Sequence, residues 1–369
     1  MITILHICWG LEVGGKEHFL YQLVNGLDPA RFTNRVVTLR RRGPFFERLV
    51  AEGHQITCLD KHAGYDPGVI FRLAAAIRAC NPDIINAHEY TAVMGSLAAG
   101  WVSPACRRSL VASLHGGHLG LPRLKRGVYY RLLRHTDAVV GVAHHLCADA
   151  QRRVPVRVPV TCIPYGVDFR RFEQTVDPVK IRTLLGLPMQ ARLVVMTARL
   201  ASQKNQACLV RAAARIARRD STIHVLIVGD GPCRAALESQ VRAAGLGDRV
   251  HLLGTRLDVV ALIQAADVCA FSSRREGLPL AIQEYLAAGR PIVATAIDGV
   301  RELVRDGVNG YLVAPDDDAA MSERIMELVG NRALAATMGR AGRLLAEDEF
   351  PLTRMILRYG AFYEGLFER

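Results

Sequence analysis

The sequence lacks the features that mark exported or membrane-spanning chains. No basic segment precedes the first apolar run at residues 2–7, so we expect no signal peptide. The apolar stretch at 92–106 is too short for a bilayer and contains Pro104. The nine cysteines form no CxxC pair, and this scattered, odd-numbered set favours buried, reduced thiols. We therefore expect a cytoplasmic protein.

Lysine is scarce, and the positive charge is uneven. Only five of the 47 cationic residues are lysine, a ratio that we attribute to coding bias more than to phosphate binding. The net charge is +12, and the first 165 residues hold 20 Lys and Arg against 11 Asp and Glu. This excess predicts an anionic partner for the N-terminal half. No aromatic-rich basic ladder accompanies it, so we expect no nucleic acid as partner.

Apolar runs typical of strands alternate with helical patterns, twice over. The first cycle has strands at 2–7, 35–39, 55–59, 83–87, 109–114, 138–142 and 160–163. The second has strands at 192–197, 223–228, 250–253, 268–272, 291–294 and 310–313. This order indicates right-handed βαβ units and mostly parallel sheets. We predict an α/β protein with domains at 1–165 and 166–349, and a final helix at 350–369 that docks on the first domain.

The most informative segment runs from residue 274 to 284. Glu276 and Glu284 flank a Gly-Leu-Pro turn that follows an apolar strand, and Pro279 suits the first turn of a helix. The amides of Gly277 and Leu278 would face an anion at the helix start. The segment predicts anion-binding amides beside two hydroxyl-binding carboxylates. A nucleotide-diphosphate sugar needs those groups.

Arg199 and Lys204 follow the strand at 192–197, at the sheet edge where ligands of parallel sheets bind. Two such cations can hold a diphosphate and stabilise the charge that grows when a glycosyl bond breaks. A loop with two surface cations is the plain alternative. The pair gains weight from the two-glutamate segment, and together they favour a functional site.

Two glycine-rich loops also follow strands. Gly229 and Gly231 permit close backbone approach to a ligand, although a turn capped by Asp230 explains them equally well. Gly14 and Gly15 open a helix but lack the full spacing of a dinucleotide fingerprint.

His115 precedes two glycines at a strand end, which would leave its imidazole exposed. No His and Glu spacing matches a zinc site, and residues 316–318 suit helix capping, so we expect no metal.

Basic residues accompany aromatic ones at 40–46 and at 123–134. If the second segment is helical, Leu124, Val128, Arg131 and Leu132 share one side, as in a helix that binds anionic lipid headgroups. An ordinary amphipathic helix with its apolar side on the sheet is the favoured alternative.

These motifs together resemble the retaining glycosyltransferases of family 4, which have the two-domain GT-B architecture. The resemblance covers nearly the whole chain and is strongest in IPYGVD (163–168), ARLASQKN (198–205), LIVGDGP (226–232), EGLPLAIQE (276–284) and DGVRELVRDGVNGYLV (298–313).

The resemblance implies roles for single residues. It implies diphosphate binding by Arg199 and Lys204, contact of Glu276 with the sugar, and ribose binding by Glu284. His115 would lie near the donor sugar. Further donor contacts are implied for Gly14, Gly15, Gly229, Gly231, Arg256, Gly277 and Leu278. Three positions depart from the family pattern: Ala198 and Tyr165 replace the usual Gly and Asn, and Asp298-Gly299 replaces the usual Gly-Gly. None of them removes a proposed charge.

The family implies transfer with retention, without a metal or cofactor, from a UDP-sugar or alternatively a GDP-sugar. The basic bias of the N-terminal half and the segment at 123–134 suggest an acceptor that is a lipid-linked or polysaccharide glycan of the cell envelope, reached from the inner face of the membrane. Three alternatives stay open: a nucleotide-sugar epimerase of the same fold, a non-catalytic nucleotide-sugar or nucleic-acid binder, and a nicotinamide-dependent oxidoreductase. The last is disfavoured by the missing glycine fingerprint.

Overall fold

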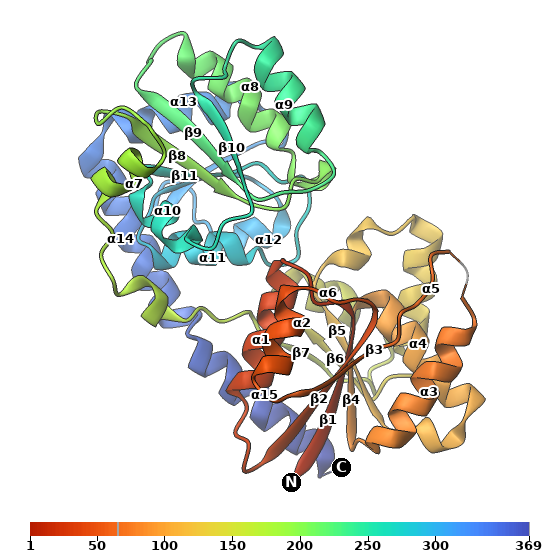
Figure 1. Ribbon diagram of the computed structural model, residues 1–369. Coiled ribbons are helices and arrows are strands. Elements are labelled where there is room, and N and C mark those ends of the chain that lie inside the picture. The colour runs from red at the N-terminus through yellow and green to blue at the C-terminus, as the bar shows by residue number, and fades with distance from the viewer. Residues whose placement is uncertain (65, 369) are drawn as a thin grey trace. The chain divides into compact units, whose positions relative to one another are not determined.

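The computed structural model describes residues 1–64 and 66–368, which form two α/β units (Figure 1). Unit 1 comprises Met1–Gly166 and Thr353–Arg369, and unit 2 comprises Val167–Leu352. All thirteen predicted strands are present, and neighbouring strands in both sheets run parallel. The predicted fold class, two Rossmann-like parallel-sheet domains, is confirmed.

Unit 1 contains a seven-stranded sheet in the order β3-β2-β1-β4-β5-β6-β7. Its central strands are almost continuously apolar because helices cover both faces. The strands are β1 (Ile2–Gly10), β2 (Phe32–Arg41), β3 (Gln55–Cys58), β4 (Ile84–His88), β5 (Ser109–Leu114), β6 (Ala138–Gly141) and β7 (Val160–Cys162). The helices are α1 (Gly15–Gly26), α2 (Pro44–Ala51), α3 (Gly68–Cys80), α4 (Glu89–Val102), α5 (Arg123–Leu133) and α6 (His144–Gln151).

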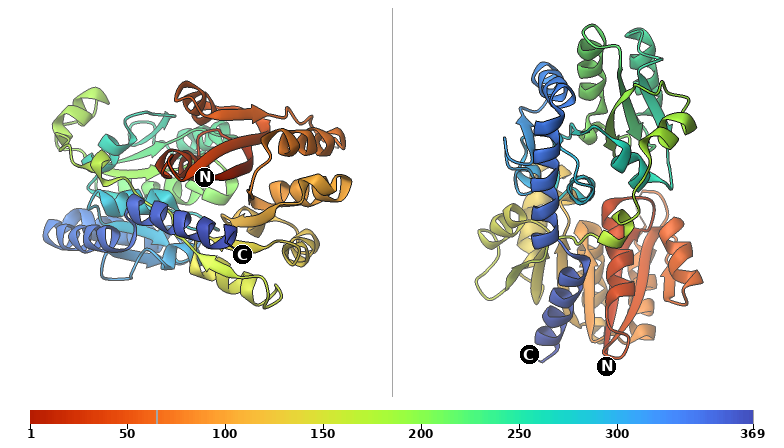
Figure 2. Two further views of the ribbon diagram at one scale, coloured as in Figure 1. Left: turned by 90° about the horizontal axis from the view of Figure 1, so that it is seen from below. Right: turned by 90° about the vertical axis from the view of Figure 1, so that its left-hand side faces the viewer.

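The last helix, α15 (Leu352–Phe367), packs on unit 1 as predicted. It buries Met355, Tyr359, Tyr363 and Leu366, and the Tyr363 hydroxyl accepts a 2.6 Å hydrogen bond from the Asn86 side chain on β4. Figure 2 shows α15 in dark blue, ending at the same edge of unit 1 as the N-terminus. The apolar content of this helix is therefore explained by burial against the first sheet.

Unit 2 contains a six-stranded sheet in the order β10-β9-β8-β11-β12-β13. The strands are β8 (Arg192–Thr197), β9 (Ile223–Val228), β10 (Val250–Gly254), β11 (Val268–Phe271), β12 (Ile292–Thr295) and β13 (Gly310–Val313). The helices are α7 (Pro178–Leu184), α8 (Gln206–Ala217), α9 (Arg234–Ala243), α10 (Val259–Ala265), α11 (Leu280–Ala287), α12 (Asp298–Arg301), α13 (Asp318–Gly330) and α14 (Arg332–Glu349). The loops after β8, β9 and β11 carry residues that were predicted to bind the phosphates and the sugar.

None of the nine cysteines is in a disulfide; five are buried, as predicted, whereas Cys58, Cys80, Cys162 and Cys233 are half-buried. Burial raises the pKa of Cys8 to about 12, which keeps this thiol protonated at neutral pH. Within the described residues, no helix combines the length and the apolar character needed to cross a membrane.

Candidate functional site

The loops after β8 and β11 bring two predicted site residues together in unit 2. Lys204 lies in a short 3-10 turn, Ser202–Lys204, and its Nζ is 2.6 Å from Glu276 Oε1. The Ser272 hydroxyl donates to the carbonyl oxygens of Lys204 and Asn205, at 3.1 and 2.9 Å, and so ties the two loops together. The side chain of Lys204 is therefore held at the strand ends and does not move freely in solvent.

Arg199 leaves the same loop and is exposed. Among the described residues, no hydrogen bond or ion pair engages its guanidinium, whereas its carbonyl accepts a 2.9 Å hydrogen bond from Gln206. The loop backbone is thus fixed while the side chain stays available. This cation can bind an incoming anion without first breaking an ion pair.

Glu284 lies on α11 and is buried, with 9% of its surface exposed. Arg171, from the 3-10 turn Phe169–Phe172, donates to Glu284 Oε1 at 3.0 Å. Burial raises the pKa of the Glu284 carboxyl, and the Arg171 guanidinium opposes that rise. Arg171 was not among the predicted site residues, because this contact joins residues 113 positions apart.

The turn before α11 offers free backbone donors. The helix begins at Leu280, and Pro279 is the capping residue immediately before it, so the prediction that Pro279 lies in the first turn was one residue early. Within the described part of the chain, no group accepts a hydrogen bond from the amides of Gly277 and Leu278. Such amides at a helix start attract an anion. Gly289, at a φ of +66°, ends the segment as predicted.

Glycines let these loops pack backbone against backbone. A Cβ atom on Gly299 would lie 1.8 Å from the carbonyl oxygen of Gly277. Added Cβ atoms on Gly229 and Gly231 would likewise lie 2.2 and 2.4 Å from the carbonyl oxygens of Ala198 and Leu200, and the two glycines have φ values of +135° and +156°. Close approach to the Arg199 loop therefore accounts for both glycines, and their contact with a ligand stays a prediction.

Two acidic features of unit 2 have structural partners. Asp230 does not cap α9, because Cys233 occupies that position and Asp230 Oδ1 accepts from the Gly231 amide at 2.7 Å. Asp317 caps α13 by accepting from the Ala320 amide, as the sequence predicts. Within the described residues, no group of three or more His, Cys, Asp or Glu is arranged to hold a metal ion.

Arg256, which was predicted to bind the donor, makes a bidentate pair with Asp258 at 2.8 and 2.6 Å. This pairing positions its guanidinium after β10. Donor contact by Arg256 stays a prediction.

The predicted residues of unit 1 lie at the start of α1 and after β5. Gly14 caps α1 and Gly15 is its first residue, which places both at the end of β1. Lys16 follows and pairs with Glu17 at 3.4 Å. The glycine loop that was predicted to open a helix and to contact the donor therefore also carries a cation at its helix start.

His115 is buried to 9% exposure, in contrast to the predicted exposed imidazole. Its Nδ1 lies 2.7 Å from the Tyr165 hydroxyl and its Nε2 lies 3.0 Å from His88 Nδ1. Phe19 packs against the His115 ring, with 5.2 Å between ring centroids. The expectation of exposure was wrong because flanking glycines do not decide burial, and residues from β4, α1 and the chain near residue 165 cover the ring.

Glu89 organises the backbone around His115. Its carboxylate accepts hydrogen bonds from the amides of His115, Gly117 and His118 at 2.8, 2.9 and 3.1 Å. Glu89 has a φ of +73°, a left-handed conformation that costs a non-glycine residue about 1–3 kcal/mol. Three charge-assisted hydrogen bonds offset that cost and fix the loop.

Helix α5 buries one of its sides in unit 1 and exposes another. Tyr129, Tyr130 and Leu133 pack into unit 1, whereas Leu124 is 81% exposed and Val128 is 44% exposed. The side that carries Leu124 and Val128 therefore does not pack on the sheet. The favoured alternative of the sequence analysis, an apolar side turned to the sheet, was wrong for these residues because Tyr129 and its neighbours fill that place.

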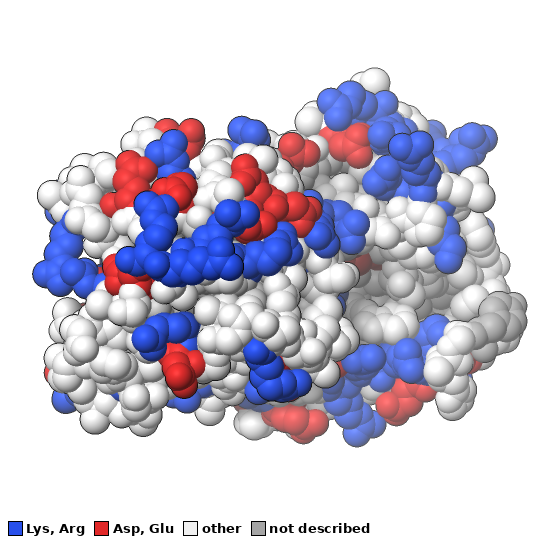
Figure 3. Space-filling model, turned by 90° about the horizontal axis from the view of Figure 1, so that it is seen from above, with Lys and Arg blue, Asp and Glu red and all other residues white. Residues whose placement is uncertain are grey.

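Charge is balanced locally on unit 2. Figure 3 shows Lys and Arg side chains beside Asp and Glu on one face of the molecule. On α8, Arg211 and Arg215 both bind Asp318, at 2.9 and 2.6 Å. Such exposed pairs add about 0–1 kcal/mol each to stability and leave little net field.

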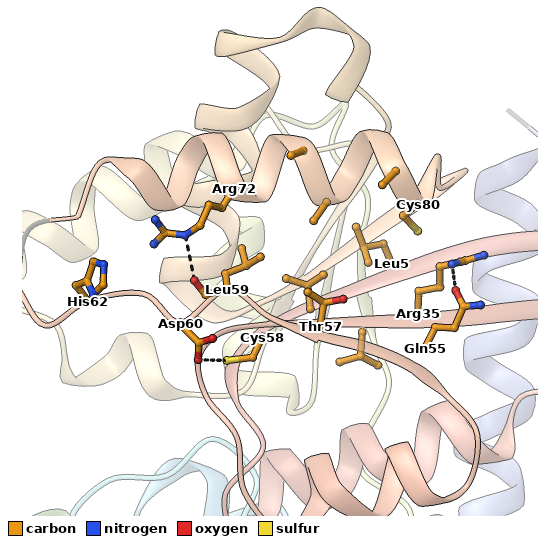
Figure 4. A pocket seen from close by; sticks show the side chains of 15 residues that line it. Leu5, Arg35, Gln55, Thr57, Cys58, Leu59, Asp60, His62, Arg72 and Cys80 are labelled. Carbon is orange, nitrogen blue, oxygen red and sulfur yellow. Dashed lines mark hydrogen bonds between the residues drawn. The ribbon is translucent and has the colours of Figure 1, made fainter.

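A cavity of about 770 Å³ lies in unit 1 between β2, β3 and α3. Figure 4 shows Arg35 and Gln55 at one end and His62 and Arg72 at the other, with apolar side chains between them. The Arg72 guanidinium donates to the Leu59 carbonyl at 3.0 Å and to Asp66 at 2.7 Å. None of the predicted site residues lines this cavity.

Comparison with known families assigns the class of protein. Residues 13–171 match Glycosyltransferase Family 4, and residues 180–345 match Glycosyl transferases group 1. The chain is 30% identical over 302 residues to EpsD of Bacillus subtilis, which is named as a glycosyltransferase, with 78% of each chain covered. The protein belongs to the family 4 glycosyltransferases of GT-B fold.

Two further similarities describe its relatives. The chain is 30% identical over 287 residues to a GDP-mannose-dependent phosphatidylinositol monomannoside mannosyltransferase of Mycolicibacterium smegmatis, covering 72% of this chain and 74% of that protein. Anabaena HepE, crystallised with UDP-glucose, has a TM-score of 0.88 at 22% identity and covers 99% of this chain and 100% of its own. The second similarity supports the GT-B fold.

Proposed function

We propose that the protein transfers a sugar from a nucleotide-diphosphate sugar to an acceptor hydroxyl, with retention of configuration at the anomeric carbon. The observation that carries this proposal is the Lys204–Glu276 pair at 2.6 Å beside the free amides of Gly277 and Leu278. A cation, two amide donors and a carboxylate at one strand end match a phosphate joined to a hydroxyl-rich ring.

The donor nucleotide is proposed to bind through Glu284. A buried carboxylate held at one oxygen by Arg171 keeps its other lone pairs for ribose hydroxyls. A UDP-sugar is the favoured donor, because HepE, which has a similar fold, was crystallised with UDP-glucose. A GDP-sugar is the alternative, because the mycobacterial relative is named as GDP-mannose-dependent.

Arg199 and Lys204 would act on the leaving diphosphate. As the bond from the anomeric carbon to the phosphate oxygen breaks, negative charge grows on that oxygen, and the two cations stabilise it by an amount on the order of 3 kcal/mol per donor. The acceptor hydroxyl forms the new bond on the same face and gives its proton to the leaving phosphate. This route needs no separate general base and no metal.

Donor binding on this account exchanges internal ion pairs for ligand contacts. Lys204 leaves Glu276 for a phosphate oxygen, and Glu276 turns to a sugar hydroxyl. Arg199 needs no such exchange, because the structure gives its side chain no partner among the described residues. We therefore expect Arg199 to make the first contact with the diphosphate.

The acceptor is proposed to be a lipid-linked or polysaccharide glycan at an anionic membrane surface. The supporting feature is α5, where exposed Leu124 and Val128 lie among Arg123, Lys125 and Arg126. The triple variant with glutamate at these three cationic positions should lose binding to vesicles that contain phosphatidylglycerol. Undiminished sedimentation with such vesicles would remove the membrane part of the proposal.

The transferase activity is tested by product analysis with UDP- and GDP-sugars. Release of nucleoside diphosphate together with a new α-linked glycoside from an α-linked donor supports the proposal, and an epimerised nucleotide sugar supports the epimerase instead. Arg199→Ala and Lys204→Ala should each lower kcat about 100-fold. Arg211→Ala, an exposed cation of the same unit, serves as the control. A raised KM with an unchanged kcat would contradict the leaving-group role.

A further inference from the structure

A continuous chain of hydrogen-bonded side chains crosses the interior of unit 1. It begins at the Tyr165 hydroxyl, which lies 2.7 Å from His115 Nδ1. His115 Nε2 lies 3.0 Å from His88 Nδ1, and His88 Nε2 lies 3.3 Å from His6 Nδ1. His6 Nε2 then lies 3.2 Å from Asn34 Oδ1. Side chains from β2, β1 and β4 thus lead to the loop after β5.

The far end of this chain fixes its direction. The Asn34 amide nitrogen donates to the Val24 carbonyl at 3.1 Å, so the Asn34 oxygen faces His6 as an acceptor. His6 must therefore donate from Nε2, which leaves Nδ1 of the neutral ring as an acceptor. The same reasoning makes His88 donate from Nε2 to His6.

His115 is the next residue along this chain of hydrogen bonds. Because His88 Nδ1 is an acceptor, His115 donates to it from Nε2, and His115 Nδ1 accepts from the Tyr165 hydroxyl. The orientation of one amide on β2 thereby sets the tautomer of an imidazole two histidines away.

The surroundings keep these rings neutral, which is required if all the hydrogen bonds of the series run in one direction. Burial lowers the pKa of His6 to about 4 and lowers those of His88 and His115 well below the ordinary value. Lys16 lowers the pKa of both His88 and His115 further, as a nearby positive charge does. A protonated ring would carry two N–H donors and break the chain.

We infer that Asn34 and Tyr165 are positioning residues that hold His115 as a neutral ring with its proton on Nε2, so that Nδ1 presents only a hydrogen-bond acceptor. A ligand group that replaces the Tyr165 hydroxyl at this nitrogen must therefore be a donor, such as a sugar hydroxyl. A phosphate or carboxylate oxygen finds no proton there. The identification of the ligand as a sugar rests on the proposed function, whereas the tautomer rests on the geometry alone.

The test is nitrogen NMR on the full protein with ¹⁵N-labelled histidine. Two-bond ¹⁵N–¹H spectra at pH 7 should show His115, His88 and His6 with protonated Nε2 and bare Nδ1. Single His→Gln variants assign the signals. In Asn34→Leu, which removes the anchoring acceptor, His115 should become a mixture of both tautomers. Asn34→Gln keeps a neutral amide with an acceptor oxygen and should restore the Nε2–H form.

An internal control is present in unit 2. His224 Nδ1 lies 3.1 Å from His251 Nε2, and this pair belongs to a separate unit, so its signals should not change in the Asn34 variants. A protonated His115 Nδ1 in the wild type, or a His115 spectrum unchanged in Asn34→Leu, would overturn the inference. If the predicted tautomers are found but no sugar is transferred from any nucleotide sugar, the proposed function fails and the tautomer assignment stands.

Transfer kinetics supply the functional measurement. Asn34→Leu should lower kcat/KM several-fold while leaving the affinity for the nucleoside diphosphate unchanged, and Asn34→Gln should restore most of the loss. Equal losses in both variants would contradict the positioning role.

Discussion

Acid should destabilise unit 1 through His6, which is fully buried on the central strand β1. The folded protein holds its pKa at about 4, against an ordinary value of 6.5, because burial disfavours the charged ring. The unfolded chain therefore binds a proton at a higher pH than the folded one. The stability that follows is fully present above pH 6.5 and is lost as the pH falls toward 4.

The size of the effect follows from these two pKa values. At pH 5 the unfolded ring is almost fully protonated and the folded ring is almost fully neutral. The free energy of unfolding should therefore fall by roughly 2 kcal/mol between pH 8 and pH 5 from this one residue. His88 faces His6 from β4 at 3.3 Å, and Tyr363 faces it from α15, so no carboxylate among these neighbours offsets the charge.

Urea unfolding followed by tryptophan fluorescence measures this loss in the right unit, because the two tryptophans, Trp9 and Trp101, both belong to unit 1. His6→Gln should remove about 2 kcal/mol of the difference between pH 8 and pH 5. His135→Gln, at an exposed position of the same unit, should leave the difference unchanged. A His6→Gln protein with the pH dependence of the wild type would refute the reasoning.

Two further predictions concern the donor site of unit 2. Gly299→Ala should weaken nucleoside diphosphate binding at least tenfold, measured by calorimetry, because its Cβ would lie 1.8 Å from the Gly277 carbonyl and displace the loop of Glu276. Gly330→Ala is the matched control, because its Cβ meets nothing within 4 Å. Equal affinities of the two variants would contradict the prediction. Because burial raises the pKa of Glu284, the carboxylate that we propose to accept ribose hydroxyls is lost at a higher pH than for an ordinary glutamate, so affinity should fall as the pH drops from 8 to 5. Glu284→Gln should abolish this dependence, and Arg171→Met should move it to higher pH; an unchanged profile in both variants would exclude Glu284 as its source.

The sequence predicted the strands well because parallel strands buried on both faces are continuous apolar runs. The thirteen strand positions, the docking of α15 and the capping by Asp317 were all confirmed. Lys204 and Glu276 were predicted to serve one site because each follows a strand, and parallel strands end at a common edge. Their 2.6 Å contact agrees with that reasoning.

Contacts between residues far apart in the sequence could not be predicted in this way. Arg171 reaches Glu284 across 113 positions, and nothing in its own segment indicates that partner. His6 did carry a signal, since a polar residue inside an apolar strand needs a buried partner. Its partners lie on β4 and β2, however, and only the folded sheet brings His88 and Asn34 beside it.

The burial of His115 and of the inner face of α5 depends on tertiary packing in the same way. The two glycines after His115 suggested exposure of the imidazole. The Gly117 amide instead donates to Glu89, and Tyr165 covers the ring. On α5, periodicity alone could not decide between the Leu124 side and the Tyr129 side.

The most direct test of donor binding is thermal stability of the wild type and Glu284→Ala against UDP, GDP, UDP-sugars and NAD. A ligand at about 100 times its Kd should add roughly 2.7 kcal/mol to the stability of the protein that binds it. Stabilisation by one nucleotide class, lost in Glu284→Ala, is the predicted result and names the base of the donor. The absence of any nucleotide effect on the wild type, or an equal effect on both proteins, would contradict the account.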